Sequence, residues 1–178
     1  MRSVFSAELE SFNEIEGGWR WWVKVWLPAV LAVLVIAIES TGTFSAENTS
    51  GWLRPLYEKL FGAISDPGWE LLHHYIRKTG HFTGYGLVSL CFFHGFRTTL
   101  RAAHGLRRLW MRSSIFAIGC TVLLASADEL HQAVLPMRGS SPLDVALDTC
   151  GAILAQLIIL AVLAGRHGAS ITGSYAAE

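Results

Sequence analysis

The sequence has few charged residues for its length. Asp, Glu, Lys and Arg together make up 16% of its 178 residues, whereas soluble domains average about 25%. The formal net charge is zero at pH 7, so the bulk charge gives no support to a nucleic acid or another polyanion as a partner. Hydrophobic residues make up 52% of the chain. This balance indicates a protein with much of its surface in lipid.

Cysteine is also scarce, and its placement argues against a disulfide framework. The three cysteines, Cys91, Cys120 and Cys150, all fall inside apolar runs. Three cannot all pair, and a buried free cysteine behaves as a small hydrophobic residue. The sequence also has no internal repeat and no signature of a catalytic nucleophile or a phosphate-cradling loop. We therefore expect no cofactor and no metal.

A secretory signal peptide is another feature that the N-terminal sequence does not match. Such signals begin with a basic segment that is followed at once by a short apolar core. Here four glutamates between residues 8 and 16 precede the first apolar run. We expect residues 1–20 to be a cytoplasmic lead-in, residues 21–165 a transmembrane domain and residues 166–178 a flexible tail.

Long apolar runs are what the sequence does contain. A helix needs ~20 mainly apolar residues to cross a bilayer, and four runs approach that length: Trp21–Ile38, Phe82–Phe96, Ile115–Leu135 and Leu143–Leu163. The second extends backward if Asp66 caps its helix and Pro67 is the first helical residue. Between the first two runs, Gly51–Phe61 has its apolar residues largely on one side. The predicted fold is all-α: a polytopic membrane helical bundle of about four transmembrane helices plus a short interfacial outer helix.

The arginines predict how the helices are oriented. Five of them fall near the connection between the second and third runs: Arg97, Arg101, Arg107, Arg108 and Arg112. Short basic loops stay in the cytoplasm. With an even number of spans, both termini are then cytoplasmic, and we expect a multi-pass protein of the bacterial inner membrane. The first and third connections face outward.

Three of the predicted spans carry polar stripes at helical spacing. The stripes are Lys78, His81, Tyr85 and Ser89; Asp128, Glu129, His131 and Gln132; and Asp144 and Asp148. Each stripe falls toward the outer end of its helix. An unpaired charge facing lipid is unfavourable, so we expect Asp128 and Glu129 to turn inward and meet Lys78, His81 or Arg138. Arg138 lies in the outer loop, and its guanidinium suits a carboxylate or a phosphate.

The motifs that carry these stripes resemble those of the VanZ-like family. Arg77-Lys78-Thr79-Gly80-His81-Phe82-Thr83-Gly84-Tyr85 is similar to its K-x-x-H-F-x-x-Y segment, and Asp128-Glu129-Leu130-His131-Gln132 to its D-E-x-x-Q segment. Arg138 followed by Asp144 resembles its P-x-R-x5-D element, and Gly151 matches a family glycine. We expect Gly151 and Ala155 to form a close-packing helix face and not a ligand site. The order agrees across residues 40–164. Two departures are Asp148, where the family often has Asn, and Ala155, where a second Gly is frequent.

The resemblance implies a small multi-helix membrane protein of the cell envelope, in a family associated with resistance to teicoplanin and related glycopeptide antibiotics. It implies no particular reaction. Our first hypothesis is that the outer cluster binds an anionic lipid or a lipid-linked envelope glycoconjugate, with Lys78 and Arg138 on the anionic group. The candidate ligand-binding residues are Lys78, His81, Tyr85, Asp128, Glu129, Gln132, Arg138, Asp144 and Asp148.

Three other functions stay open at this point. A membrane enzyme would use Glu129, His131 or Asp128 in acid–base chemistry. A metal-dependent version would add His81, although the spacing is too loose to predict a metal. A transporter would need an oligomer, and the sequence gives no oligomeric state. A structural or partner-binding protein would use the cluster only to fix helix packing.

Overall fold

The structure is a computed structural model that describes residues 18–101, 105–135 and 140–175, with side chains described as far as Arg166. The helices are α2 (Gly18–Glu39), the 3₁₀ helix η1 (Gly42–Phe44), α3 (Ala46–Phe61), α4 (Asp66–Thr99), α5 (Leu106–Ala133) and α6 (Pro142–Tyr175). The described residues contain no strand, which confirms the all-α prediction. Most of the predicted lead-in lies outside the described residues, and α6 includes much of the predicted tail.

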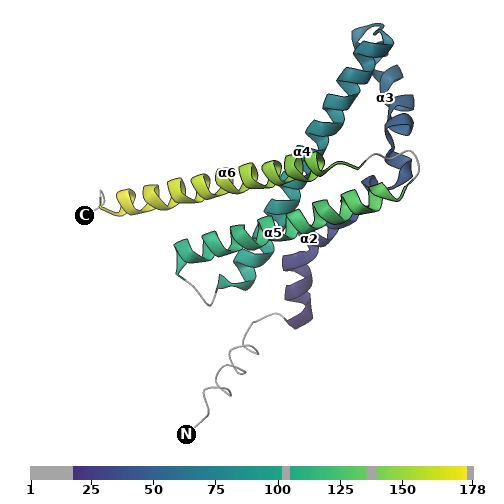
Figure 1. Cartoon of the computed structure of the whole chain (residues 1–178). Coiled ribbons are helices and arrows are strands. Elements are labelled where there is room, and N and C mark those ends of the chain that lie inside the picture. The colour runs from purple at the N-terminus through teal and green to yellow at the C-terminus, as the bar shows by residue number, and fades with distance from the viewer. Residues whose placement is uncertain (1–17, 102–104, 136–139, 176–178) are drawn as a thin grey trace.

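Helix α4 is the centre of the bundle. It packs against α2, α5 and α6, and α5 and α6 also pack against each other. Figure 1 shows α4 running from the end that carries α3 down between the other helices. Every other long helix therefore contacts α4, and the polar stripe on α4 has neighbours on several sides.

Three helices in the described part of the chain are long and apolar enough to cross a membrane: α2, α5 and residues Pro142–Arg166 of α6. Helix α4 is longer than α2 and α5, at 34 residues, but its first turns are polar. Its apolar part, residues 82–96, falls short of the ~20 residues that a span needs. Helix α4 is not among these three helices because it carries the polar stripe. The other long helices pack around α4.

Two helix starts differ from those predicted. The N-cap of α4 is Ser65, whose hydroxyl accepts a hydrogen bond from the Gly68 amide at 3.4 Å, so Asp66 is the first helical residue and not the cap. Helix α5 begins at Leu106, well before Ile115. Arginine is a good helix former whose long side chain can reach toward headgroups. The basic segment from residue 107 to residue 112 is therefore part of α5 and not of a loop.

Helices α4 and α6 approach most closely at Gly151. A Cβ atom added there would overlap the carbonyl oxygen of Phe82, and one added at Gly86 would lie 3.2 Å from the Gly151 carbonyl oxygen. Beyond this crossing, Gln156 donates hydrogen bonds to the carbonyl and hydroxyl oxygens of Ser89 at 3.0 and 2.9 Å. The expectation that Gly151 lies on a close-packing face is confirmed.

Helix α3 lies against the first turns of α4. The Trp69 indole donates to the Ser50 hydroxyl at 2.6 Å, and the Thr49 hydroxyl is 3.1 Å from Nε2 of His73. Arg54 donates to Asp66 at 2.7 Å. The other side of α3 exposes large apolar residues: Trp52, Leu56, Leu60 and Phe61. The predicted short helix is confirmed, although it begins at Ala46 and not at Gly51. Its place at the membrane surface stays a prediction.

Candidate functional site

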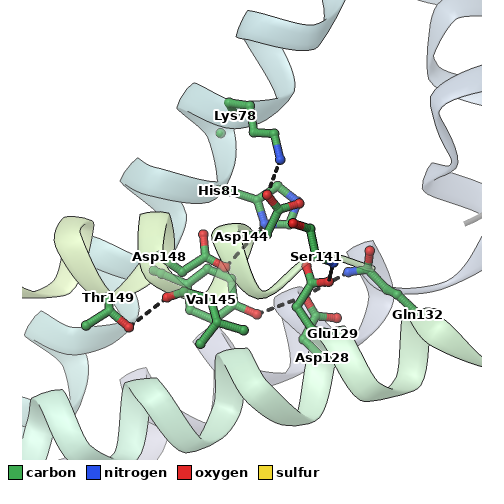
Figure 2. Close-up of polar contacts among 12 residues, drawn as sticks. Lys78, His81, Asp128, Glu129, Gln132, Ser141, Asp144, Val145, Asp148 and Thr149 are labelled. Atoms are coloured by element: carbon green, nitrogen blue, oxygen red, sulfur yellow. Dashed lines mark hydrogen bonds and ion pairs between the residues drawn. The ribbon is translucent and has the colours of Figure 1, made fainter. Parts of the chain in front are cut away.

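The polar stripes of three helices converge, as predicted. We use the name polar cluster for eight side chains: Lys78, His81 and Tyr85 of α4, Asp128, Glu129 and Gln132 of α5, and Asp144 and Asp148 of α6. Figure 2 labels seven of them, gathered where the end of α5 and the start of α6 meet the middle of α4, and Tyr85 joins them through its hydrogen bond to Asp128. The cluster is built from helix ends and helix faces that lie far apart in the sequence.

The first contact in the cluster is an ion pair between Lys78 and Asp144. The two side chains are 31% and 19% exposed, so this pair stands at the edge of the cluster. Both partners also line a groove between α4 and α6. A ligand in that groove can therefore reach a positive and a negative group side by side.

One turn deeper, His81 faces Asp148. Nδ1 of His81 lies 3.6 Å from Oδ2 of Asp148, which is too long for a hydrogen bond but close enough for an ion pair when the imidazole is protonated. Asp148 is 0% exposed, and neither of its carboxylate oxygens has a hydrogen-bond partner among the described residues. A buried carboxylate in such surroundings is stabilised by an adjacent positive charge.

On α5, the carboxylate of Asp128 is the centre of a buried hydrogen-bond network. Oδ2 of Asp128 accepts from the Tyr85 hydroxyl at 2.9 Å and from the Gln132 amide at 3.0 Å. All three residues are buried. This network ties α4 to α5 and fixes the rotation of both helices at the level of the cluster.

Glu129 has a different partner. Its Oε2 accepts a hydrogen bond from the Ser141 backbone amide at 2.8 Å, while the Ser141 hydroxyl accepts from the Leu143 amide at 3.2 Å. Glu129 thus holds the start of α6 against the end of α5, and the Ser141 hydroxyl caps α6. The Glu129 side chain therefore positions the first turn of α6, which carries Asp144.

We predicted that Asp128 and Glu129 would pair with Lys78 or His81 of α4, and that prediction was wrong. Lys78 and His81 lie three residues apart and face Asp144 and Asp148, which lie four residues apart on α6. Residues at i, i+3 and i, i+4 share one helix face, so α4 and α6 form two ion pairs that are one helical turn apart. The carboxylates of α5 instead accept hydrogen bonds from hydroxyl, amide and backbone donors. Arg138 lies outside the described residues.

His131 does not join the cluster. Its side chain is exposed, and its Nδ1 lies 2.9 Å from the hydroxyl of Ser40 at the end of α2. On α5, positions 128, 129 and 132 point inward, whereas position 131 points toward α2. The alternative in which His131 is the general base of the polar cluster therefore has no support from its position.

Two polar residues outside the predicted set lie next to the polar cluster. Ser40 contacts His131, and Gln156 continues the polar face of α6 inward from Asp148. The i, i+4 steps from Asp144 through Asp148 to Ala152, followed by Gln156, were available in the sequence as a signal. Nothing in the local pattern around Ser40 indicated that it would meet α5.

Carboxylates outnumber cations in the cluster. The described residues contribute four carboxylates against one lysine and one histidine. No three of the described His, Cys, Asp and Glu residues are grouped so that they could hold a metal ion. The excess negative charge must be offset by protons, by a bound positive group or by residues outside the described part, because unpaired buried charge is costly.

The groove between α4 and α6 has a volume of about 670 Å³. Its apolar wall includes Tyr75, Phe82, Leu143 and Leu147, and Lys78, Ser141 and Asp144 lie along it. Apolar walls with a few placed polar groups are typical of sites for amphiphilic ligands. A second pocket, of about 200 Å³, lies on the opposite side of α4 under α3.

The family model for VanZ/LLP1 matches residues 20–163, which is most of the chain and includes every residue of the polar cluster. No curated protein matches the sequence, and no solved structure matches it either.

Proposed function

The chain belongs to the VanZ/LLP1 family, and we propose that it binds an anionic lipid or a lipid-linked envelope glycoconjugate in the groove between α4 and α6. The observation that carries this proposal is the Lys78–Asp144 ion pair on the wall of an otherwise largely apolar groove. An amphiphile has the matching form, with an apolar chain and a charged headgroup at one end.

The polar side of the groove favours a headgroup that both accepts and donates hydrogen bonds. A phosphate oxygen takes the ammonium group of Lys78 in a charge-assisted hydrogen bond. Sugar hydroxyl or amide groups donate to the carboxylate of Asp144, which a simple anion would not satisfy. This combination favours a glycoconjugate that carries a phosphate over a plain phosphate ester.

The membrane setting is part of the same proposal. Three helices of the described chain are apolar enough to span a membrane, and α4, at 34 residues, is long enough to be the fourth span that the predicted topology needs. The family match covers residues 20–163. We place the protein in the bacterial inner membrane with both termini in the cytoplasm, because the arginines between residues 97 and 112 lie at the end of the bundle away from the cluster. The groove then opens at the outer leaflet, and a link to teicoplanin resistance would act through the lipid held there.

A structural role is the second candidate, because the Tyr85–Asp128–Gln132 network links helices without needing a ligand. The two functions differ at Lys78. A structural ion pair with Asp144 loses stability when either partner is removed, whereas a binding site responds to the two substitutions in opposite directions.

Lys78→Ala should lower the retention of phosphatidylglycerol about tenfold or more, because a hydrogen bond to a charged group contributes roughly 1.5–3 kcal/mol. Asp144→Asn should raise that retention, because it removes the carboxylate that competes for the lysine, while the asparagine carbonyl can still accept a hydrogen bond from a headgroup hydroxyl. Native mass spectrometry of the purified protein with added phosphatidylglycerol, and with phosphatidylcholine for comparison, measures both changes. Lys59→Ala on the exposed side of α3 is the matched control. Equal retention by all three variants and the wild type would reject the groove as the binding site.

A further inference from the structure

A small enclosed cavity lies inside the bundle, apart from the lipid groove. Its volume is about 30 Å³, enough for one water molecule or one dehydrated ion. Side chains of α2, α4 and α5 line it, including Ser40, His81, Tyr85, Asp128 and Gln132. No residue lines both this cavity and the α4–α6 groove. The two spaces are therefore separate sites.

The groups that line this cavity are mainly oxygen donors. Asp128 is 7% exposed, and its Oδ2 is occupied by Tyr85 and Gln132. Its other oxygen, Oδ1, is buried and has no hydrogen-bond partner among the described residues. Ser40 and Tyr85, which both carry a hydroxyl group, also line this space. Carboxylate and hydroxyl oxygens are the ligands that hard cations prefer.

The charge balance of the surroundings favours a positive occupant. Asp128 lies beside the cavity and the fully buried Asp148 lies behind His81, which is the one basic side chain among the described lining residues. Two buried carboxylates against one imidazole leave a negative excess in a region of low dielectric. A single positive charge next to Oδ1 of Asp128 removes that excess.

The cavity adjoins a second, larger pocket. Glu39, Gly80 and His81 line both the cavity and the pocket under α3. The side of the bundle between α3 and α4 is therefore the nearest entry side for an ion, and it is separate from the lipid groove.

We propose that this cavity binds one dehydrated monovalent cation, with Asp128 as its charged ligand and Ser40 and Tyr85 as neutral oxygen ligands. A divalent metal is disfavoured, because the described residues offer no group of three suitable side chains. The bound ion joins α2, α4 and α5 at the level where the polar cluster meets the cavity. Binding to the folded state alone stabilises that state in proportion to ion activity.

The experiment is thermal unfolding of the full-length protein in detergent, with LiCl, NaCl or KCl titrated against choline chloride at constant ionic strength. The proposal predicts a saturable rise in Tm with at least one alkali cation and none with choline. Asp128→Asn, which keeps the shape and removes the charge, should abolish the rise. Glu70→Gln, an exposed change on the same helix α4 as His81 and Tyr85, should keep it.

Equilibrium binding of ²²Na⁺ and ⁸⁶Rb⁺ to the wild type gives a second measurement that does not depend on a variant folding. One bound ion per chain supports the proposal. A Tm that depends on pH but not on the alkali cation, with no ion bound, would show that protons balance the carboxylates and would overturn it. Because the lipid groove shares no lining residue with the cavity, failure here leaves the lipid-binding result unchanged.

Discussion

Gly151→Ala is expected to give a protein that no longer assembles stably at temperatures at which the wild type is intact. The added Cβ would overlap the backbone carbonyl of Phe82, and a change of side-chain rotamer cannot move a backbone atom. The two helices must separate instead, which weakens the Gln156–Ser89 contacts beyond the crossing. Overpacking of this kind costs roughly 1–3 kcal/mol and occasionally more, and we expect the upper part of that range.

Size-exclusion chromatography after a series of heating steps measures this loss as a lower temperature for the disappearance of the monodisperse peak. Gly165→Ala is the matched control, because it lies on the same helix and a Cβ there has no neighbour within 4 Å. Alanine in an open helical position stabilises by about 0.5–1 kcal/mol. If both variants behaved like the wild type, the close crossing of α4 and α6 would be wrong.

His81→Ala is expected to destabilise the protein strongly, because it leaves Asp148 without the base that faces it. Removing one partner of a buried ion pair costs roughly 3–5 kcal/mol, since the other charge stays buried and uncompensated. Asp148→Asn alone should have little effect or be mildly stabilising, because the imidazole that remains can release its proton and become neutral. The two single substitutions are therefore expected to be strongly unequal.

The double variant tests the pairing directly. Once Asp148 is replaced by Asn, His81→Ala no longer leaves a buried charge, so the double variant should recover most of the stability that the single His81→Ala variant lost. Thermal unfolding of the four proteins gives the interaction energy between the two positions. Additive effects would show that His81 and Asp148 do not act as a pair.

The convergence of the polar stripes could be predicted because it depends on few assumptions. Lys78, His81 and Tyr85 follow helical spacing, and their helix and the one that begins near Asp144 start at the same end of the bundle. Gly151 was likewise recognisable as a packing residue. Errors of several residues in helix ends, such as the early start of α5 at Leu106, did not move the cluster.

The pairing within the cluster could not be predicted from the sequence. Helical periodicity says which side chains share a face, but the partner across an interface depends on how far one helix is shifted along the other. A shift of one turn exchanges the partners of Lys78. The Gly151 crossing sets that shift, and it brings Asp144 and Asp148, and not the α5 carboxylates, opposite the bases of α4. The same argument explains why His131 turned out to face Ser40.

The most direct test of the polar cluster is zero-length carbodiimide cross-linking of the unmodified protein in native membranes. The ammonium group of Lys78 contacts the carboxylate of Asp144, and both side chains are partly exposed, so the reagent should join them by an amide bond. Peptide mass spectrometry is predicted to find the Lys78–Asp144 cross-link, and no cross-link from Lys59 to α6. A folded protein in which Lys78 reacts only with carboxylates of its own helix, or not at all, would contradict the convergence of α4 and α6.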